Sequence, residues 1–363
     1  MDTSLPTLGW TSSSSSFDVD NRRRLEVNSS SMADWAAIQT DIIGIIVKKL
    51  TIPDYLRFRA VCTSWNHACT DVSYHPRVDP WLMLHPNSQD GVKFFCVPEK
   101  ENQIIRLPST FTLFGSVWTP VGSSHGWLIY FSQTLGSMQL VNPISGRQIQ
   151  LPPLGRRLFS KAVLLEMNER NFIVAVLYGD QKGYKVTRKG YTSWSSVESK
   201  HILEDIVKHK GHLYTSDMYG TVEVWAEPPR AWPDEEVTPH RRLRCLVETP
   251  AGDLIRVKRQ DANKFSVWIL DRGAFSWVEI DNIGDFALFV SHYNSVCFVA
   301  KDHPNLKANC IYFIDTYNNL CTFSLENGIK ELVQDLAMGP ALNEHFRRRP
   351  LRDQLIWFIP SLK

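Results

Sequence analysis

The chain has 363 residues, with 40 Lys and Arg against 38 Asp and Glu, so its formal net charge is +2. Hydrophobic residues make up 43% of it and include 12 Trp, 18 Phe and 11 Tyr, which is enough apolar surface for a folded core. This composition excludes a wholly disordered chain, and the balanced charge gives no support for nucleic-acid binding.

Neither a membrane span nor a secretory signal is expected. The strongest apolar run, Phe172 to Tyr178, is far shorter than the roughly 20 residues that a span needs. The N-terminus has no basic segment followed by an apolar one. The 7 Cys are scattered without a Cys-x-x-Cys pair, so we expect reduced thiols, mostly small buried side chains, in a cytoplasmic or nuclear protein.

Residues 1–31 form a low-complexity tail with an unbroken serine run from Ser12 to Ser16. So few apolar groups cannot offset the backbone entropy lost on folding, so we predict disorder. Met32 opens a different composition and is a candidate functional start. Short basic clusters are interpreted as surface charge, with nuclear import as an alternative; they lie at 22–24, 241–244 and 347–349.

Residues 32–75 are expected to form short helices. Ile42, Ile46 and Leu50 recur at helical spacing, which predicts a helix capped by Thr40 and stopped by Pro53.

Two further helices are expected in the same module. Asp54 is a plausible cap for a helix from Tyr55 to Val61, and Thr63 or Ser64 for one that carries Trp65. A module of about 40 residues seldom buries enough surface by itself. Its surplus of apolar side chains therefore needs cover from the rest of the chain or from a partner.

Residues 76–363 have the composition of an all-β domain. Short runs rich in β-branched and aromatic residues alternate with turn residues, and hardly a helix is indicated among them. The expected strands are Trp81–Leu84, Val92–Val97, Gln103–Leu107, Trp127–Phe131, Gln139–Asn142, Phe172–Tyr178, Leu213–Thr215, Val222–Trp225, Leu254–Lys258, Phe265–Leu270, Phe286–Val290, Ser295–Ala300, Cys310–Ile314, Leu320–Ser324 and Leu355–Ile359. Such a pattern is typical of a sandwich, a barrel or a propeller.

Internal echoes favour the propeller. Ile105-Arg106-Leu107-Pro108 recurs 44 residues later as Ile149-Gln150-Leu151-Pro152, and Trp194-Ser195-Ser196-Val197 resembles the stretch from Trp277 to Ile280. Ile329 to Leu332 is a further candidate copy, and Leu213 to Asp217 resembles Ile311 to Asp315. A period of about 45 residues predicts about six blades of four strands, with a two-sheet sandwich as the alternative.

The ends of the β-rich region suggest how the ring closes. Trp81 to Leu84 begins it, and Leu355 to Ile359, five apolar residues in a row, ends it before Pro360. A run of this kind suits a central strand rather than an exposed edge. We therefore predict that 355–359 pairs in the same blade as the strands of 81–107.

The helical module resembles an F-box. The specific part is Arg57 to Trp65, Arg-Phe-Arg-Ala-Val-Cys-Thr-Ser-Trp, preceded by Trp35 to Ile43 and by Lys49-Leu50. The sequence departs from the family at Ile38-Gln39, where Leu-Pro is usual. What the resemblance implies is binding to a Skp-type adaptor through Ile38, Ile42, Leu50, Leu56, Phe58, Val61, Cys62 and Trp65.

The C-terminal part resembles the kelch-like plant F-box proteins that carry a propeller-like domain. The residues are Trp277 to Asp285, Leu288 to Val290 and Asn309 to Phe313, with His125 to Leu128 and Asn142-Pro143. The fold expected is a helical F-box followed by an all-β propeller. The resemblance implies a non-catalytic substrate receptor of a Skp–cullin–F-box ubiquitin ligase, with no cofactor, nucleic acid or membrane and an unknown protein substrate.

The sequence leaves other functions to consider. A Skp-bound protein outside ubiquitin transfer remains an alternative, and a propeller hydrolase would need carboxylates converging at one end of the ring. A helix-turn-helix reader of DNA is disfavoured because the basic residues of the helices are few and interleaved with apolar ones.

Individual motifs favour structural over chemical roles. His209 and His212 flank Lys210-Gly211, which predicts a turn rather than a metal site. Ser123 to Gly126 is not a nucleophile elbow, and Asp234 to Glu236 is interpreted as a solvated acidic loop. The Trp residues are expected to pack between blades, although Trp118, Trp225 or Trp232 could anchor a partner.

Overall fold

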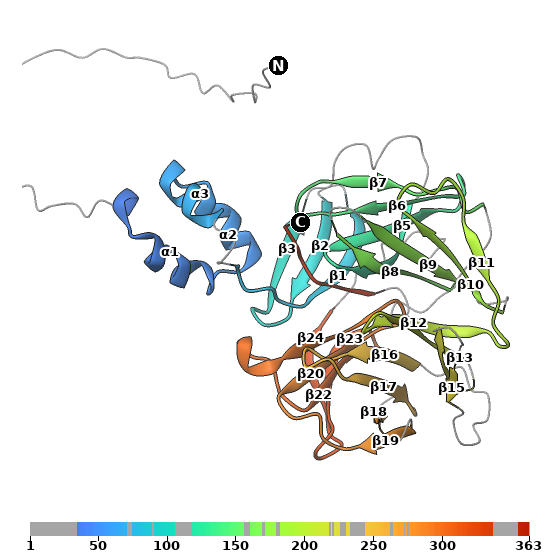
Figure 1. Ribbon diagram of the computed structural model, residues 1–363. Coiled ribbons are helices and arrows are strands. Elements are labelled where there is room, and N and C mark those ends of the chain that lie inside the picture. Colours follow the sequence, from blue (N-terminus) through green and yellow to red (C-terminus); the bar gives the residue numbers. More distant parts are fainter. Residues whose placement is uncertain are drawn as a thin grey trace, which may run out of the picture.

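A ring of β-sheets with a small helical module beside it makes up the described structure (Figure 1). This computed structural model describes residues 35–70, 75–88, 91–105, 118–155, 160–168, 171–178, 182–217, 219, 221–225, 230–232, 244–261, 264–271, 273, 276–336 and 355–362. Outside these residues lie the predictions for the tail 1–31, for Met32, for the acidic loop 234–236 and for most of the basic clusters.

Three α-helices follow a short 3-10 helix in the helical module. They are α1 (Thr40–Val47), α2 (Ile52–Arg59) and α3 (Thr63–Cys69), after the 3-10 helix Trp35–Ala37. Among the described residues, no helix is both long and apolar enough to cross a membrane.

The predicted boundary between the first two helices is wrong. Pro53 does not stop α1, which ends at Val47; it lies in the first turn of α2, where a missing backbone N–H breaks no helical hydrogen bond. Thr51, not Asp54, caps α2, and its hydroxyl accepts a hydrogen bond from the Asp54 backbone N–H at 3.4 Å.

The predicted caps of the other two helices also need correction. Gln39 rather than Thr40 occupies the N-cap of α1, and Cys62 rather than Thr63 or Ser64 occupies that of α3. Neither side chain makes a capping hydrogen bond. Packing rather than capping therefore positions these two helix starts.

Six sheets form the ring, and we call them blades 1 to 6. From the innermost strand outward, blade 1 is β25 (Ile356–Phe358), β1 (Trp81–Ser88), β2 (Gly91–Cys96), β3 (Glu101–Ile105), and blade 2 is β4 (Trp118–Ser124), β5 (Trp127–Ser132), β6 (Ser137–Val141), β7 (Gln148–Gln150). In the same order, blade 3 is β8 (Lys161–Met167), β9 (Phe172–Leu177), β10 (Tyr184–Arg188), β11 (Ser195–Val197), and blade 4 is β12 (Leu203–His209), β13 (His212–Asp217), β14 (Val222–Trp225), β15 (Arg230–Trp232). Blade 5 is β16 (Arg244–Glu248), β17 (Leu254–Arg259), β18 (Phe265–Asp271), β19 (Ser276–Ile280), and blade 6 is β21 (Ser295–Val299), β20 (Phe286–Val290), β22 (Cys310–Ile314), β23 (Asn319–Ser324), β24 (Lys330–Asp335). This six-bladed propeller confirms the predicted fold.

Blade 6 differs from the predicted four-stranded blade because it has five strands. Its strand β20 pairs in parallel with β22, and β21 is added antiparallel on the inner side. A 3-10 helix, Ala300–Asp302, lies in the connection that leads back from β21 to β22.

The ring closes as predicted from the two ends of the β-rich region. β25 pairs antiparallel with β1, with Trp81 opposite Phe358 and Met83 opposite Ile356. Trp357, between them on β25, is fully buried. Since β25 comes from the far end of the chain, blade 1 needs both ends of the propeller to be complete.

The internal echoes mark equivalent places in the ring. Ile105 ends β3 and Ile149 lies in β7, the outer strands of neighbouring blades, so the 44-residue spacing is one blade. Trp277 lies in β19 and Trp194 directly precedes β11, the outer strands of blades 5 and 3. The repeat prediction is confirmed for these pairs.

The second echo corresponds to a shared turn. The Oδ1 atoms of Asp217 and Asp315 each accept hydrogen bonds from the backbone N–H groups two and four residues later, at 2.8–2.9 Å. A carboxylate satisfying its own turn in this way explains why Asp recurs at the end of these strands.

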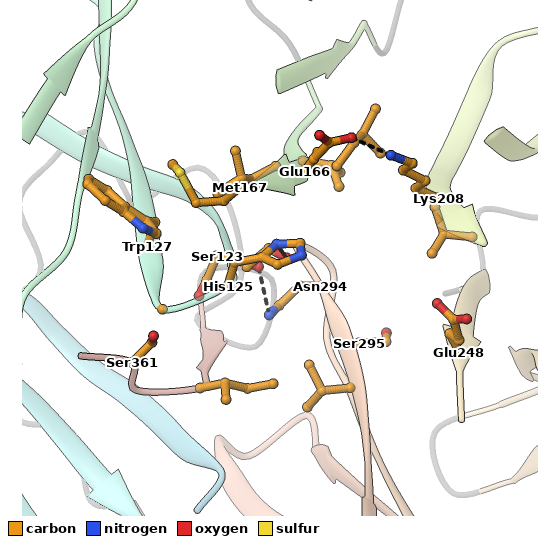
Figure 2. Close-up of a pocket in the computed structure, with 18 of the residues that line it drawn as sticks. Ser123, His125, Trp127, Glu166, Met167, Lys208, Glu248, Asn294, Ser295 and Ser361 are labelled. Carbon is orange, nitrogen blue, oxygen red and sulfur yellow. Dashed lines mark hydrogen bonds and ion pairs between the residues drawn. The ribbon is translucent and has the colours of Figure 1, made fainter. Parts of the chain in front are cut away.

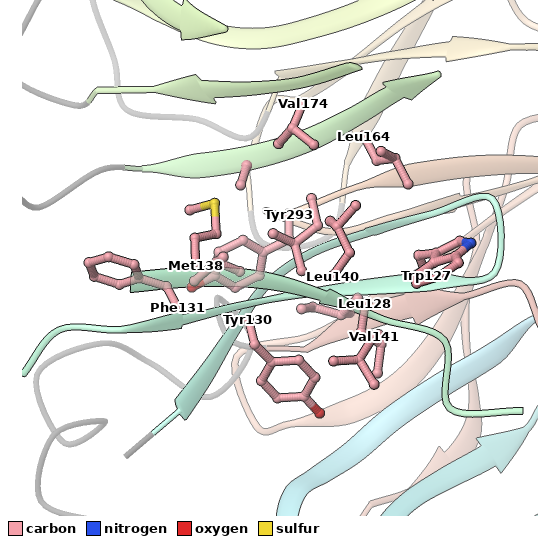
Figure 3. Packing of buried hydrophobic residues seen from close by; sticks show 14 of the residues in the cluster. Trp127, Leu128, Tyr130, Phe131, Met138, Leu140, Val141, Leu164, Val174 and Tyr293 are labelled. Carbon is pink, nitrogen blue, oxygen red and sulfur yellow. The ribbon is translucent and has the colours of Figure 1, made fainter. Parts of the chain in front are cut away.

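The core lies between neighbouring blades all the way round. One apolar cluster joins blades 1, 2 and 3, and four others join blades 3 and 4, 4 and 5, 5 and 6, and 6 and 1. Figure 3 shows part of the first cluster, where Met138 of blade 2 lies on the side of Leu164 and Val174 of blade 3, and Tyr130 points to the opposite side of the blade 2 sheet. The Trp excess is explained in part by this packing, as predicted.

The cysteines are free thiols, and five of the seven are buried. Burial raises the pKa of Cys245 and of Cys297 to about 12, which keeps both thiols protonated at neutral pH.

The segment after α3 is fixed to the propeller by hydrogen bonds and ion pairs. The Arg77 backbone N–H donates to the Leu50 carbonyl at 2.8 Å, and its guanidinium pairs with Asp79 and Glu99. The buried Asp79 carboxylate also bonds His303 Nδ1 of blade 6 at 2.8 Å. These contacts connect the helical module directly to blades 1 and 6.

Candidate functional site

The first helix of the module, α1, is apolar on both of its faces. Ile43 is 1% exposed and packs with the buried Val47 in the module's core. Ile42 and Ile45 lie on the opposite side and are 48% and 60% exposed. A helix that is apolar all round is normally buried, so the outer side of α1 has the character of an interface.

The other two helices and their connection also expose apolar side chains. Leu56 of α2 is 40% exposed and Val61, between α2 and α3, is 61% exposed. Phe58 and Trp65 stack beside them, with ring centroids 4.2 Å apart. We call the exposed set Trp35, Ile42, Ile45, Leu56 and Val61 the apolar face of the module.

The core beneath this face is small. It contains Ile43, Val47, Tyr55 and Cys69, and the Tyr55 hydroxyl donates to the Cys69 carbonyl at 2.8 Å. Trp35 is tied to the module because its carbonyl accepts a hydrogen bond from the Trp65 indole at 2.8 Å.

The residues that the resemblance implied for adaptor binding fall into two groups. Ile42, Leu56 and Val61 are exposed, whereas Ile38, Leu50, Phe58, Cys62 and Trp65 are partly buried. Four of the second group, all but Cys62, pack against the module's own core. Sequence reasoning missed Ile45 and Trp35, whose exposure depends on how the helices pack.

A central cavity of about 1620 Å³ runs between the inner strands of the propeller. Its lining includes residues of β4, β8, β12, β16 and β21 and the segment 359–362 that follows β25. Four of these inner strands, β4, β8, β12 and β16, were not predicted as strands from the sequence, so the lining was not foreseen.

Charged side chains connect the inner strands of blades 3, 4 and 5 around this cavity. Lys161 of β8 forms a buried ion pair with Asp205 of β12, at 2.5 Å, and Asp205 also accepts the Leu246 backbone N–H of β16 at 2.9 Å. Closer to the strand ends, Lys208 pairs with Glu166, and this contact lowers the pKa of Glu166.

His209, adjacent to Lys208 on β12, completes this set. Its Nδ1 lies 2.9 Å from an Oε1 of Glu248 on β16. His209 is fully buried, and Lys210-Gly211 forms the predicted turn next to it.

His125 projects into the cavity between the Glu166–Lys208 pair and Asn294 (Figure 2). Its Nδ1 lies 2.7 Å from the Ser124 hydroxyl. Desolvation by the surrounding walls lowers the pKa of His125, and Lys208 acts in the same direction, although Glu166 and the Leu164 carbonyl oppose them. The imidazole is therefore neutral at neutral pH.

The Asn294 side chain hydrogen-bonds to two other blades where the ring closes. Its side-chain amide donates to the Trp357 carbonyl at 2.6 Å and its Oδ1 accepts the Trp357 backbone N–H at 3.0 Å, as a neighbouring strand would. The same amide donates to the Ser123 carbonyl of β4. Blades 1, 2 and 6 thus meet at this side chain.

The helical module and the segment after it contribute to the lining of the cavity. His75 and Pro76 line it from the segment after α3, and Ile52 lines it from α2. Ser361, whose carbonyl accepts from the Asn142 side chain at 3.0 Å, lines it too, and the next residue, Leu362, packs on the module's core. One short C-terminal segment therefore touches both the cavity and the helices.

The suggested Trp anchors are not free surface groups. Trp118 is buried at the start of β4, and the Trp225 indole donates to the Thr215 hydroxyl at 2.9 Å while its ring packs on Tyr184. The expectation that either is a partner anchor is therefore wrong. The Trp232 side chain lies outside the described residues.

Comparison with known families agrees with this architecture. Residues 38–77 match the F-box domain, and residues 92–325 match the KIB1-4 beta-propeller. The chain belongs to the KIB1-4 beta-propeller family. Its apolar face is thus the surface of an F-box, and its cavity is the central channel of a KIB1-4 propeller.

Curated relatives have the same combination of parts. This KIB1-4 protein is similar to F-box protein At2g05970 of Arabidopsis thaliana, at 22% identity over 79% of this chain and 86% of the relative. It is also similar to F-box protein At2g26160 of the same plant, at 24% identity over 78% and 96%. These matches show that its relatives include plant F-box proteins. They do not identify the kelch-like subtype that the sequence suggested.

A solved structure from a nidogen/laminin complex is similar at 9% identity and a TM-score of 0.43, over 70% of this chain and 92% of that chain.

Proposed function

We propose that this protein is the substrate receptor of a Skp–cullin–F-box ubiquitin ligase. Its F-box binds the Skp-type adaptor, and its propeller holds a protein substrate. The observation that carries the proposal is the apolar face, where α1 presents Ile42 and Ile45 outward while Ile43 and Val47 already fill the core. Five exposed large apolar side chains in so small a module are typical of an interface that a partner covers.

A receptor of this kind needs no catalytic group of its own. Holding the substrate near the ligase's transferable ubiquitin raises its effective concentration there. The channel carboxylates support this assignment over a hydrolase, because Glu166, Asp205 and Glu248 are each engaged with a basic side chain. A glycosidase would instead need two carboxyl groups available to one bond.

The test is adaptor binding by the full chain carrying Ile42→Glu and Ile45→Glu. Both positions are exposed, so the fold should persist, while two charges in an apolar interface should weaken binding at least about a hundredfold. The matched control is Ile329→Glu with Leu332→Glu on the propeller, which are 53% and 62% exposed and should leave binding unchanged. Undiminished capture of an Arabidopsis Skp-type adaptor by the F-box variant would overturn the proposal.

The variant Leu50→Ala with Trp65→Ala is a less decisive test. Both side chains are partly buried against the F-box core, so losing them weakens the fold as well as any interface. Loss of binding would then have two explanations.

A Skp-bound protein outside ubiquitin transfer is the second candidate. It shares the F-box interaction and differs only in the next partner. Co-purification of the cullin scaffold with the full chain, lost in the Ile42→Glu, Ile45→Glu variant, supports the receptor. Adaptor without cullin supports the alternative.

A further inference from the structure

The charges that line the central channel leave an excess of positive charge. The lining contains four cationic side chains, Arg147, Lys161, Lys208 and Lys210, and three carboxylates. Lys161 and Lys208 are each paired with one of those carboxylates. Within the part of the chain that the structure describes, Arg147 and Lys210 have no ion-pair partner, and both are exposed.

Two of the turns that line the channel hold residues in an unfavourable backbone conformation. His125-Gly126 connects β4 to β5 with φ of +54° and +79°, and Lys210-Gly211 connects β12 to β13 with φ of +46° and +85°. Two-residue hairpin turns with positive φ at both positions favour Asn, Asp or Gly at the first. Side chains other than these cost some stability at such positions.

Aromatic and amide groups complete the wall near these cations. The Arg147 guanidinium lies 5.6 Å from the centre of the Trp127 ring, which holds it over the blade 2 side of the channel. Asn168, Asn171 and Asn294 add side-chain amides to the lining. Their N–H groups already donate within the protein, to Glu166 and to the Ser123 and Trp357 carbonyls, so Arg147 and Lys210 remain the cationic donors for a ligand.

The size and position of the channel fit a segment of polypeptide. Its volume of about 1620 Å³ exceeds the roughly 300–1,000 Å³ of typical small-ligand pockets. Its lining reaches His75 and Pro76, next to the F-box, and the segment 359–362.

We propose that the channel binds an acidic peptide segment of a protein partner, with Arg147 and Lys210 receiving its anionic side chains. His125 lines the same channel. This inference rests on the proposed function, since it assigns a chemical class to the substrate that the propeller holds. The Glu166–Lys208 pair does not oppose it, because that carboxylate is already neutralised.

The test is fluorescence anisotropy of the full chain with a labelled oligo-glutamate peptide. We expect it to bind at least about tenfold more tightly than a Gly-Ser peptide of equal length, and to weaken as salt is added. Lys210→Asn and Arg147→Gln should each weaken binding roughly fivefold, the effect of one exposed ion pair. Asn suits the positive φ at 210, so this variant should fold at least as well as the parent.

The matched control is Lys100→Asn. Lys100 also has a positive φ, of +56°, in an exposed turn, but it does not line the channel. It should leave peptide binding unchanged. If Lys100→Asn weakens binding as much as Lys210→Asn does, the attraction is general surface charge and the inference is wrong.

A phosphoserine peptide and its unphosphorylated twin separate the two sources of negative charge. Binding of oligo-glutamate shows that carboxylates suffice, and binding of the phosphoserine peptide alone makes phosphate the anion. If neither binds better than the Gly-Ser peptide, the inference is overturned. Adaptor capture distinguishes the two failures. If the parent chain captures the adaptor but neither anionic peptide, only the inference is wrong. If the parent chain does not capture the adaptor, the proposed function is wrong.

Discussion

The F-box buries four apolar side chains in its own core and leaves five large ones exposed, whereas each blade of the propeller packs apolar side chains against its neighbours on both sides. The propeller obtains its closure from its own chain, because β25 returns to pair with β1. The F-box receives only Leu362 from the described part of the same C-terminal segment, and its five large apolar side chains stay exposed. Exposed apolar surface therefore differs between the two regions: in the F-box five large side chains are gathered in one small module, and in the propeller they are scattered.

Removing β25 should have the largest effect. A chain that ends after Arg352 loses the four buried side chains from Leu355 to Phe358. Deleting one large buried side chain costs about 2–5 kcal/mol, so the sum matches the about 5–15 kcal/mol that stabilise a whole domain. We expect loss of the cooperative thermal transition in circular dichroism.

The control for this deletion is a chain that ends after Pro360, which keeps β25 and should retain a cooperative transition. A chain ending after Arg352 that melts like the full protein would show that the ring does not need its closing strand.

A paired substitution in α1 should separate the two cores. Ile43→Ala removes a buried side chain and should cost about 2–4 kcal/mol, whereas Ile45→Ala, at an exposed site, should change stability by less than about 0.5 kcal/mol. Hydrogen exchange should show lost protection in residues 35–70 of the Ile43→Ala protein and intact protection in the propeller. Equal loss in both regions would mean that the two unfold as one unit.

Two glycines test how tightly the C-terminal segment is held. Gly126 and Gly190 both have positive φ, +79° and +85°, but a Cβ on Gly126 would lie 2.2 Å from Ser361 Cβ, while one on Gly190 meets nothing within 4 Å. Both Ala variants bear the backbone strain of about 1 kcal/mol, and only Gly126→Ala should lose about 1–3 kcal/mol more through overpacking. Urea unfolding measures the difference, and equal losses would mean that residues 361–362 move aside without cost.

The smallest expected effect is the pH dependence contributed by His125. Because its pKa is lowered in the folded protein, the unfolded chain binds the proton more readily. Stability is therefore lost as pH falls through the usual imidazole pKa of about 6.5 toward the lowered folded value. The His125→Asn protein should lose less stability than the parent between about pH 7.5 and 5.5 in urea unfolding.

The control for this prediction is His67→Asn on the exposed surface of α3, which should keep the parent's pH dependence. A His125→Asn protein with an unchanged pH profile would mean that the channel does not disfavour the charged imidazole.

The inner strands show where sequence reasoning stopped. Strands such as β9 and β22 are nearly continuous apolar runs, and their pattern predicted them. The inner strands β8, β12 and β16 mix apolar residues with Lys161, Glu166, Asp205, Lys208 and Glu248, so neither alternation nor a continuous run is visible. A weaker signal was present, because the paired charges lie 39 to 44 residues apart, which is one blade.

By itself the sequence determined the parts that depend on local pattern and repetition: an F-box motif, a β-rich domain with a 44-residue period, and an apolar last strand suited to closing the ring. Only the tertiary structure decided which side of α1 is exposed, because Ile42 and Ile43 are identical in chemistry and differ only in the neighbours that the fold gives them. It also decided the lining of the channel. Those side chains come from five blades and from the segment 359–362, far apart in the chain, and no local pattern encodes distances that exist only after the ring has closed.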